Sequence, residues 1–200
     1  TPASLEALGA ARRIGTGMGA AVVTFIAVAR DDPGDHEAEI RSLGEHGADK
    51  VVLMRAEKLS GPRLWANCGA PLLQACAAVH PTVVILPGTA AGCDIGPRLA
   101  AAIGAAFLPS VTIECEPHQL VLWRSVYGAT YRRKLAVDGS TSPVVITVTP
   151  GVHPRAAGVD QAEVMLMDAP ATTESDSDIE FLSSADDPGA AMETADIVVV

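Results

Sequence analysis

The chain has 200 residues, of which 48% are hydrophobic and 19% charged, a globular composition that excludes a disordered chain. Its formal net charge is −10, and its densest basic cluster is the short Arg132-Arg133-Lys134, expected as a solvated turn or strand end. We therefore expect no nucleic-acid partner. Thr1 to Ser4 leads directly into a helical pattern and no apolar run spans a bilayer, so we expect neither a signal peptide nor membrane insertion.

The first half of the chain alternates between helical and buried-strand patterns. Ser4 is a suitable N-cap for a first helix that reaches about Ile14, and the glycine-rich stretch 15–19 is expected to end it. The following predicted elements are strand 21–28, helix 35–45 closed by Gly47, strand 50–54, helix 62–79 with Leu64, Leu72, Leu73 and Cys76 inward, strand 82–86, and a helix with Leu99, Ala100 and Ile103 on one face. This alternation predicts a parallel sheet with right-handed crossovers.

The pattern changes after that helix. Strands are predicted at 110–114, 120–125 and 144–148, with turns at 118–119 and 138–142 and no helix between them. We therefore predict a three-layer α/β fold. A mostly parallel sheet carries helices on both faces, as in nucleotide-hydrolase-like or Rossmann-like domains, with antiparallel hairpin strands added.

The composition divides the chain into three parts. Residues 1–150 are predicted to form the N-terminal α/β domain, and 151–193 an extended connecting arm with short strands at 163–167 and 179–182. Residues 194–200 contain a buried-strand signature with no helix after it. We expect them to be the first strand of a truncated cofactor-binding domain, and the missing initiator Met suggests a trimmed start as well.

Two glycine-rich stretches could bind phosphate. The stretch 15–19 follows a helix and precedes a strand, the reverse of a phosphate loop, so we interpret it as a helix cap and turn. The stretch 88–96 follows a strand and opens a helix, which makes its residues candidates for cofactor binding: Gly88, Thr89, Gly92 and Asp94. It lacks a Walker lysine. The alternative is that Asp94 caps the helix and pairs with Arg98.

No other residues form a catalytic or metal-binding pattern. No Cys-x-x-Cys pair occurs, so the thiols are expected to be small buried side chains of a reducing compartment: Cys68, Cys76, Cys93 and Cys115. The histidines fall in predicted loops or at element ends and are expected to be incidental surface residues: His36, His46, His80, His118 and His153. Packing or interface roles are expected for Trp65, Trp123, Tyr127 and Tyr131. We predict no catalytic residue, no metal ligand and no enzyme activity.

Six segments occur in the order expected of one known family. They are 4–12, 47–51, 92–101, 124–129, 147–152 and the terminal 195–199. Together they resemble the N-terminal domain of the alpha subunit of electron-transfer flavoprotein. The sequence departs from the family in lacking its opening strand and in the basic segment Tyr131 to Lys134.

The resemblance implies a function for the intact protein. In the family, alpha and beta subunits form a heterodimer that carries electrons from flavin dehydrogenases, such as the acyl-CoA dehydrogenases of fatty acid oxidation, to a quinone reductase or another acceptor. FAD lies in the alpha subunit's second domain, and the beta subunit holds AMP or a second FAD. The resemblance thus implies that residues 1–200 are a scaffold and a beta-subunit interface, in the cytoplasm or, in a eukaryote, the mitochondrial matrix.

An alternative function is open. The stretch 88–96 could make this domain a module that binds ATP or AMP, since many α/β domains of this shape do so. A hydrolase or transferase is disfavoured because no nucleophile lies beside a base in the sequence pattern.

Overall fold

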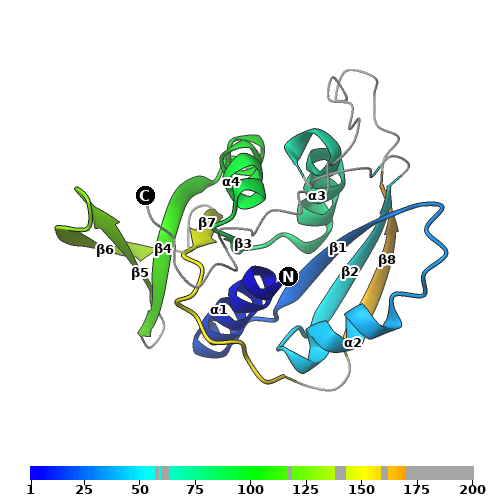
Figure 1. Ribbon diagram of the computed structural model, residues 1–200, viewed down its shortest axis with the longest axis horizontal. Coiled ribbons are helices and arrows are strands. Elements are labelled where there is room, and N and C mark those ends of the chain that lie inside the picture. The colour runs from blue at the N-terminus through cyan, green and yellow to red at the C-terminus, as the bar shows by residue number, and fades with distance from the viewer. Residues whose placement is uncertain (57–58, 60–63, 117–118, 138–142, 159–161, 170–200) are drawn as a thin grey trace, which may run out of the picture.

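The computed structural model describes residues 1–56, 59, 64–116, 119–137, 143–158 and 162–169. The elements, in chain order, are α1 (Pro2–Met18), β1 (Val23–Ala29), α2 (Glu37–Glu45), β2 (Lys50–Ala56), α3 (Trp65–Val79), β3 (Val83–Pro87), α4 (Ala90–Ile103), β4 (Ala106–Glu116), β5 (Gln119–Val126), β6 (Tyr131–Val137), β7 (Val144–Val148) and β8 (Glu163–Asp168). They form an α/β fold with helices on both sides of the strands (Figure 1). The predicted fold class is confirmed.

The strands form a three-stranded sheet in the order β1-β2-β8 and a five-stranded sheet in the order β3-β7-β4-β5-β6. All pairings are parallel except β4–β5 and β5–β6, so the predicted antiparallel addition is present. Within the five-stranded sheet, β4 joins the parallel part to the antiparallel part, because its first half pairs with β7 and its second half with β5. The sequence analysis did not predict β6 as a strand, since its first four residues are all exposed and show no apolar alternation.

The core has two layers, one on each face of β7. Ala10 and Ile14 of α1 cluster with Ile146, whereas Val145 clusters with Leu99 of α4 on the opposite face. Successive strand side chains point to opposite faces, so an unbroken run of Val and Ile is what a doubly covered strand requires. α1 and α2 therefore lie on one side, and α3 and α4 on the other (Figure 1).

α1 begins and ends at other residues than the sequence predicted. Its N-cap is Thr1, whose hydroxyl accepts a hydrogen bond from the Ser4 backbone N–H, and Pro2 occupies the first turn, where its missing N–H costs nothing. The helix continues through Gly15 to Met18 and is closed by Gly19, which is left-handed at φ 66°. Gly15 lies within the helix, and its missing side chain leaves room for the Ala20 carbonyl oxygen and the Val22 side chain.

After β7 the chain passes along α1 and reaches β8. The Gly151 N–H donates to Glu6 of α1 at 2.6 Å, and the Gly158 N–H donates to the Glu45 carbonyl at 2.7 Å. The predicted strand 163–167 is confirmed as β8, which pairs with β2. The division of the chain at residues 150 and 193 remains a prediction. His118, residues 138–142, and the predicted strands 179–182 and 195–200 lie outside the described residues.

Candidate functional site

The stretch 88–96, whose residues are candidates for cofactor binding, is mostly helix. Only Gly88 and Thr89 lie between β3 and α4, whereas Gly92 and Asp94 lie inside α4. The Thr89 side chain caps the helix, because its hydroxyl accepts a hydrogen bond from the Gly92 N–H at 3.3 Å. The turn therefore satisfies one of the N–H groups that a phosphate would need.

The glycines of this stretch allow close packing. A Cβ at Gly88 would lie 2.6 Å from the Val148 carbonyl oxygen, and a Cβ at Gly96 would lie 2.6 Å from the Phe107 ring. A Cβ at Gly92 would overlap the Pro87 carbonyl oxygen. The Cβ positions of these three glycines thus face protein atoms and not an open cradle.

The alternative interpretation expected Asp94 to cap its own helix, α4, but it does not. Its carboxylate accepts a hydrogen bond from the Trp65 N–H at 2.8 Å, at the start of α3, because Thr89 already caps α4. The expected pair with Arg98 is present, with Nη2 and Oδ1 3.4 Å apart. Asp94 therefore links the N-terminal turns of α3 and α4, and its negative charge opposes an anion there.

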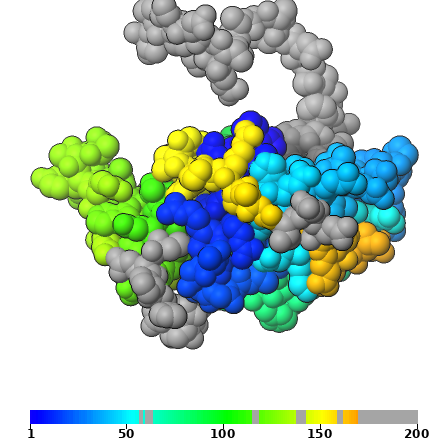
Figure 2. Space-filling model, turned by 90° about the horizontal axis from the view of Figure 1, so that it is seen from below, coloured from blue at the N-terminus to red at the C-terminus, as the bar shows by residue number. Residues whose placement is uncertain are grey.

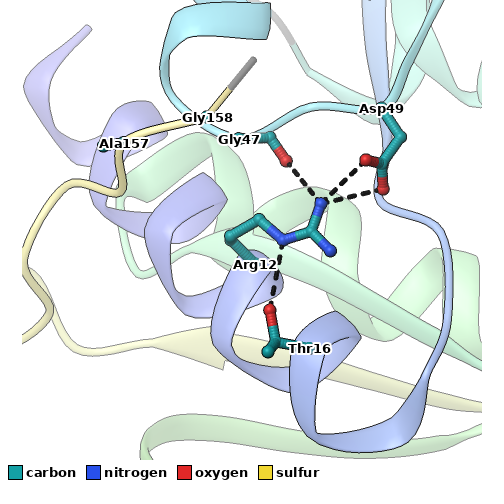
Figure 3. A pocket seen from close by; sticks show the side chains of 6 residues that line it. All are labelled: Arg12, Thr16, Gly47, Asp49, Ala157 and Gly158. Atoms are coloured by element: carbon teal, nitrogen blue, oxygen red, sulfur yellow. Dashed lines mark hydrogen bonds and ion pairs between the residues drawn. The ribbon is translucent and has the colours of Figure 1, made fainter.

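A hollow of about 320 Å³ lies beside α1 (Figure 3). It is lined by Arg12, Thr16, Gly47, Asp49, Ala157 and Gly158. The Arg12 guanidinium points to Asp49, and its Nε donates to the Thr16 hydroxyl at 3.4 Å. Arg12 and Asp49 therefore balance each other's charge at this junction between α1 and the segments that contain Gly47 and Gly158. The sequence analysis missed this pair, although both residues lie in the segments 4–12 and 47–51.

Two groups of side chains differ from expectation. His153 is buried, with 4% of its surface exposed, and neither ring nitrogen has a partner among the described residues. It was expected at the surface, but it lies where the chain passes along α1.

Cys93 is exposed, contrary to the prediction, because it points away from the buried side of α4, whereas Cys68 is buried. No three metal-ligating side chains gather in the described part of the chain.

The start of β5 pairs with β4 and packs in the core, whereas the far ends of β5 and β6 project beyond the helices as a two-stranded ribbon (Figure 1). It carries the basic residues 132–134 and two exposed tyrosines, Tyr127 and Tyr131. The prediction that residues 132–134 form a solvated turn or strand end is confirmed in part, because they are exposed but lie within a full strand. No helix in the described ranges is long and apolar enough to cross a membrane.

These features define a Rossmann-like α/β domain in which the glycines around the β3–α4 turn pack closely against neighbouring protein atoms. The model of the electron transfer flavoprotein domain family matches residues 1–172, and the chain belongs to this family. Protein FixB of Clostridium saccharobutylicum is 27% identical over 155 residues, which are 76% of this chain and 44% of that protein. The chain thus spans less than half the length of this relative.

Proposed function

We propose that this chain is the N-terminal domain of an alpha-type subunit of an electron transfer flavoprotein, where it serves as the platform and the interface for a beta-type subunit. The observation that carries the proposal is the family match over residues 1–172. The packed glycines of the β3–α4 turn support it, because they leave the platform without a phosphate cradle of its own.

The chemistry of the intact protein follows from this proposal. FAD binds to a second domain of the alpha-type subunit, and the beta-type subunit holds AMP or a second FAD. The heterodimer carries electrons from acyl-CoA dehydrogenases or related flavoenzymes to a quinone reductase or another acceptor. The chain itself is no enzyme, and it works in the cytoplasm or, in a eukaryote, in the mitochondrial matrix.

A binding experiment tests the proposal. Purified residues 1–200 are mixed with the beta-type subunit from the same organism and examined by analytical ultracentrifugation. We expect a 1:1 complex, a colourless chain on its own, and a melting temperature that rises with the concentration of the beta-type subunit. Stoichiometric flavin held by residues 1–200 alone, or no complex at micromolar concentration, would contradict it.

A nucleotide-binding module remains the second candidate. In its favour, Gly88 and Thr89 follow a strand and open a helix capped by Thr89, which is where anions bind in α/β folds. Against it stand the packed glycines and the Asp94 carboxylate. Isothermal titration with AMP and ATP distinguishes the two candidates, and we expect no heat of binding at millimolar nucleotide.

A further inference from the structure

The connection between β7 and β8 lies against α1 and forms neither helix nor strand over residues 151–158, which are named here the strap. Figure 2 shows this segment, in yellow, beside the blue of α1. Hydrogen bonds fix its two ends, from the Gly151 N–H to Glu6 and from the Gly158 N–H to the Glu45 carbonyl. In the described part of the chain, residues 152–157 take part in no hydrogen bond. The middle of the strap is therefore held by packing.

The strap packs against its neighbours backbone to backbone. A Cβ at Gly9 of α1 would overlap the Pro154 carbonyl oxygen, and a Cβ at Gly158 would overlap the Gly44 carbonyl oxygen. Gly151, where the strap begins, has a left-handed φ of 75°, which glycine adopts without strain. Glycines at both ends thus allow the strap to bend away from α1 without a change in either sheet.

His153 is the buried side chain of the strap. Only 4% of its surface is exposed, and neither ring nitrogen has a hydrogen-bond partner among the described residues. The neutral ring already leaves one donor and one acceptor unsatisfied there, and an imidazolium would bring a second N–H donor and a positive charge to the same place. The buried position of the ring therefore favours the neutral form strongly over the protonated form.

The charged groups that act on the ring lie on α1. Arg13 repels an imidazolium, whereas Glu6 attracts it but already accepts the Gly151 N–H at 2.6 Å. Arg155, the other charged residue of the strap, is exposed. Burial, the largest effect, and Arg13 together lower the pKa of His153, against the opposing effect of Glu6. The buried ring is thus neutral above the ordinary value of 6.5, and the pressure to leave its site grows as the pH falls below that value.

We propose that the strap is a pH-sensitive switch: when His153 takes up a proton, its ring moves into water and residues 151–157 detach from α1, while both sheets stay folded. β8 remains paired with β2 from Glu163 to Asp168, because this ladder does not involve the strap. The opening is therefore local, and it exposes the surface of α1 around Gly9. This inference does not rest on the proposed function.

Nuclear magnetic resonance of the isotope-labelled chain tests this proposal, because it follows the His153 ring and the backbone in one sample. The ring carbons report protonation as the pH is lowered from about 8 to about 4.5, and relaxation of the amide nitrogens reports backbone order. We expect the order parameters of residues 151–157 to fall from about 0.85 to below about 0.6, with the midpoint of ring protonation. Those of β2 and β7 should stay at about 0.85.

Three variants show whether the opening depends on His153. His153→Leu keeps an apolar side chain in the buried site and takes up no proton, so its strap should stay ordered throughout the same pH range. Arg13→Gln removes the repelling cation, so the ring should titrate closer to 6.5 and the strap should keep more of its order in acid. The control His80→Asn removes an exposed histidine outside the strap, at the end of α3, and should open as the wild type does.

Each contrary result overturns the switch. Order parameters of the strap that stay constant while the His153 ring titrates would show that the strap does not respond to the proton. A ring that remains neutral at the lowest pH would show that no proton is taken up. Loss of order in β2 and β7 at the same midpoint as in the strap would show unfolding of the whole domain. Since the beta-type subunit is absent from these samples, every one of these results leaves the proposed function untouched.

Discussion

Arg12 on α1 binds both carboxylate oxygens of Asp49, just before β2, with its Nη1 at 2.8 Å and 2.9 Å. Asp49 also accepts a hydrogen bond from the Val22 N–H, just before β1, at 2.7 Å. One carboxylate therefore joins the first helix to the beginnings of two neighbouring parallel strands. The side chains are 27% and 35% exposed, so solvent screens the pair only in part.

We expect Asp49→Ala to lower the free energy of unfolding by about 2 kcal/mol, because it leaves the Val22 N–H without its acceptor and removes the carboxylate partner of the Arg12 guanidinium. Arg12→Lys should lower the free energy of unfolding by less, since lysine keeps the positive charge, although it lacks the planar guanidinium that binds both carboxylate oxygens. Urea unfolding followed by circular dichroism measures both.

The matched control is Lys50→Gln. Lys50 also forms an ion pair near the start of β2, with Glu163 at 2.7 Å, but those side chains are 40% and 65% exposed. Its loss should cost less than about 1 kcal/mol. If Lys50→Gln and Asp49→Ala shift the urea midpoint equally, the carboxylate has no special role at the strand starts.

We predict that Gly92→Ala destabilises the domain by about 3 kcal/mol, because its Cβ would overlap the Pro87 carbonyl oxygen, which belongs to rigid backbone. Gly104→Ala is the control, since Gly104 has φ 66° and open space around it, and should cost about 1 kcal/mol. Thermal denaturation compares the two. A smaller effect at position 92 than at position 104 would contradict the packing role.

His153 makes stability depend on pH. Burial lowers its pKa, Arg13 lowers it further, and Glu6 opposes them. The unfolded chain therefore binds the proton more readily, so this contribution is complete above the ordinary value of 6.5 and is lost as the pH falls toward the folded pKa. We expect His153→Leu to flatten the dependence of the melting temperature on pH below about 6.5.

Arg13→Gln provides a graded comparison for His153. Removing this cation should raise the pKa of His153 and shrink the acid-dependent loss without abolishing it. A wild-type melting temperature that changes with pH no more than that of His153→Leu would refute the assignment.

Asp94→Ala should destabilise the domain by about 1 kcal/mol, because the Trp65 N–H at the start of α3 loses its acceptor. Asp94→Asn keeps an acceptor oxygen and should cost less. Arg98→Gln removes only the exposed partner, 56% exposed, and should cost less than about 0.5 kcal/mol. Urea unfolding separates the contribution of the Trp65–Asp94 hydrogen bond from that of the Asp94–Arg98 ion pair. If Asp94→Ala and Arg98→Gln lower the free energy of unfolding equally, the hydrogen bond between the two helices does not stabilise the domain.

Periodic patterns predicted the layered fold, and β7 begins and ends at the residues expected from its apolar run, 144–148. Features that depend on distant contacts were not predictable. Arg12 and Asp49 are 37 positions apart, and no local rule pairs them. His153 is buried only because the chain after β7 lies along α1. Ser4 was expected as the N-cap, but Thr1 caps α1, and Pro2 at the first helical position favours that start.

The pairing of β2 with β8 has a consequence for synthesis of the protein. β2 is the central strand of its sheet, yet its partner follows about a hundred residues later. At ribosomal speeds this interval lasts on the order of 5 to 20 s, during which one edge of an apolar strand has no partner. The nascent chain therefore carries an open sheet edge that can join another copy, and chaperone binding during this interval would protect β2.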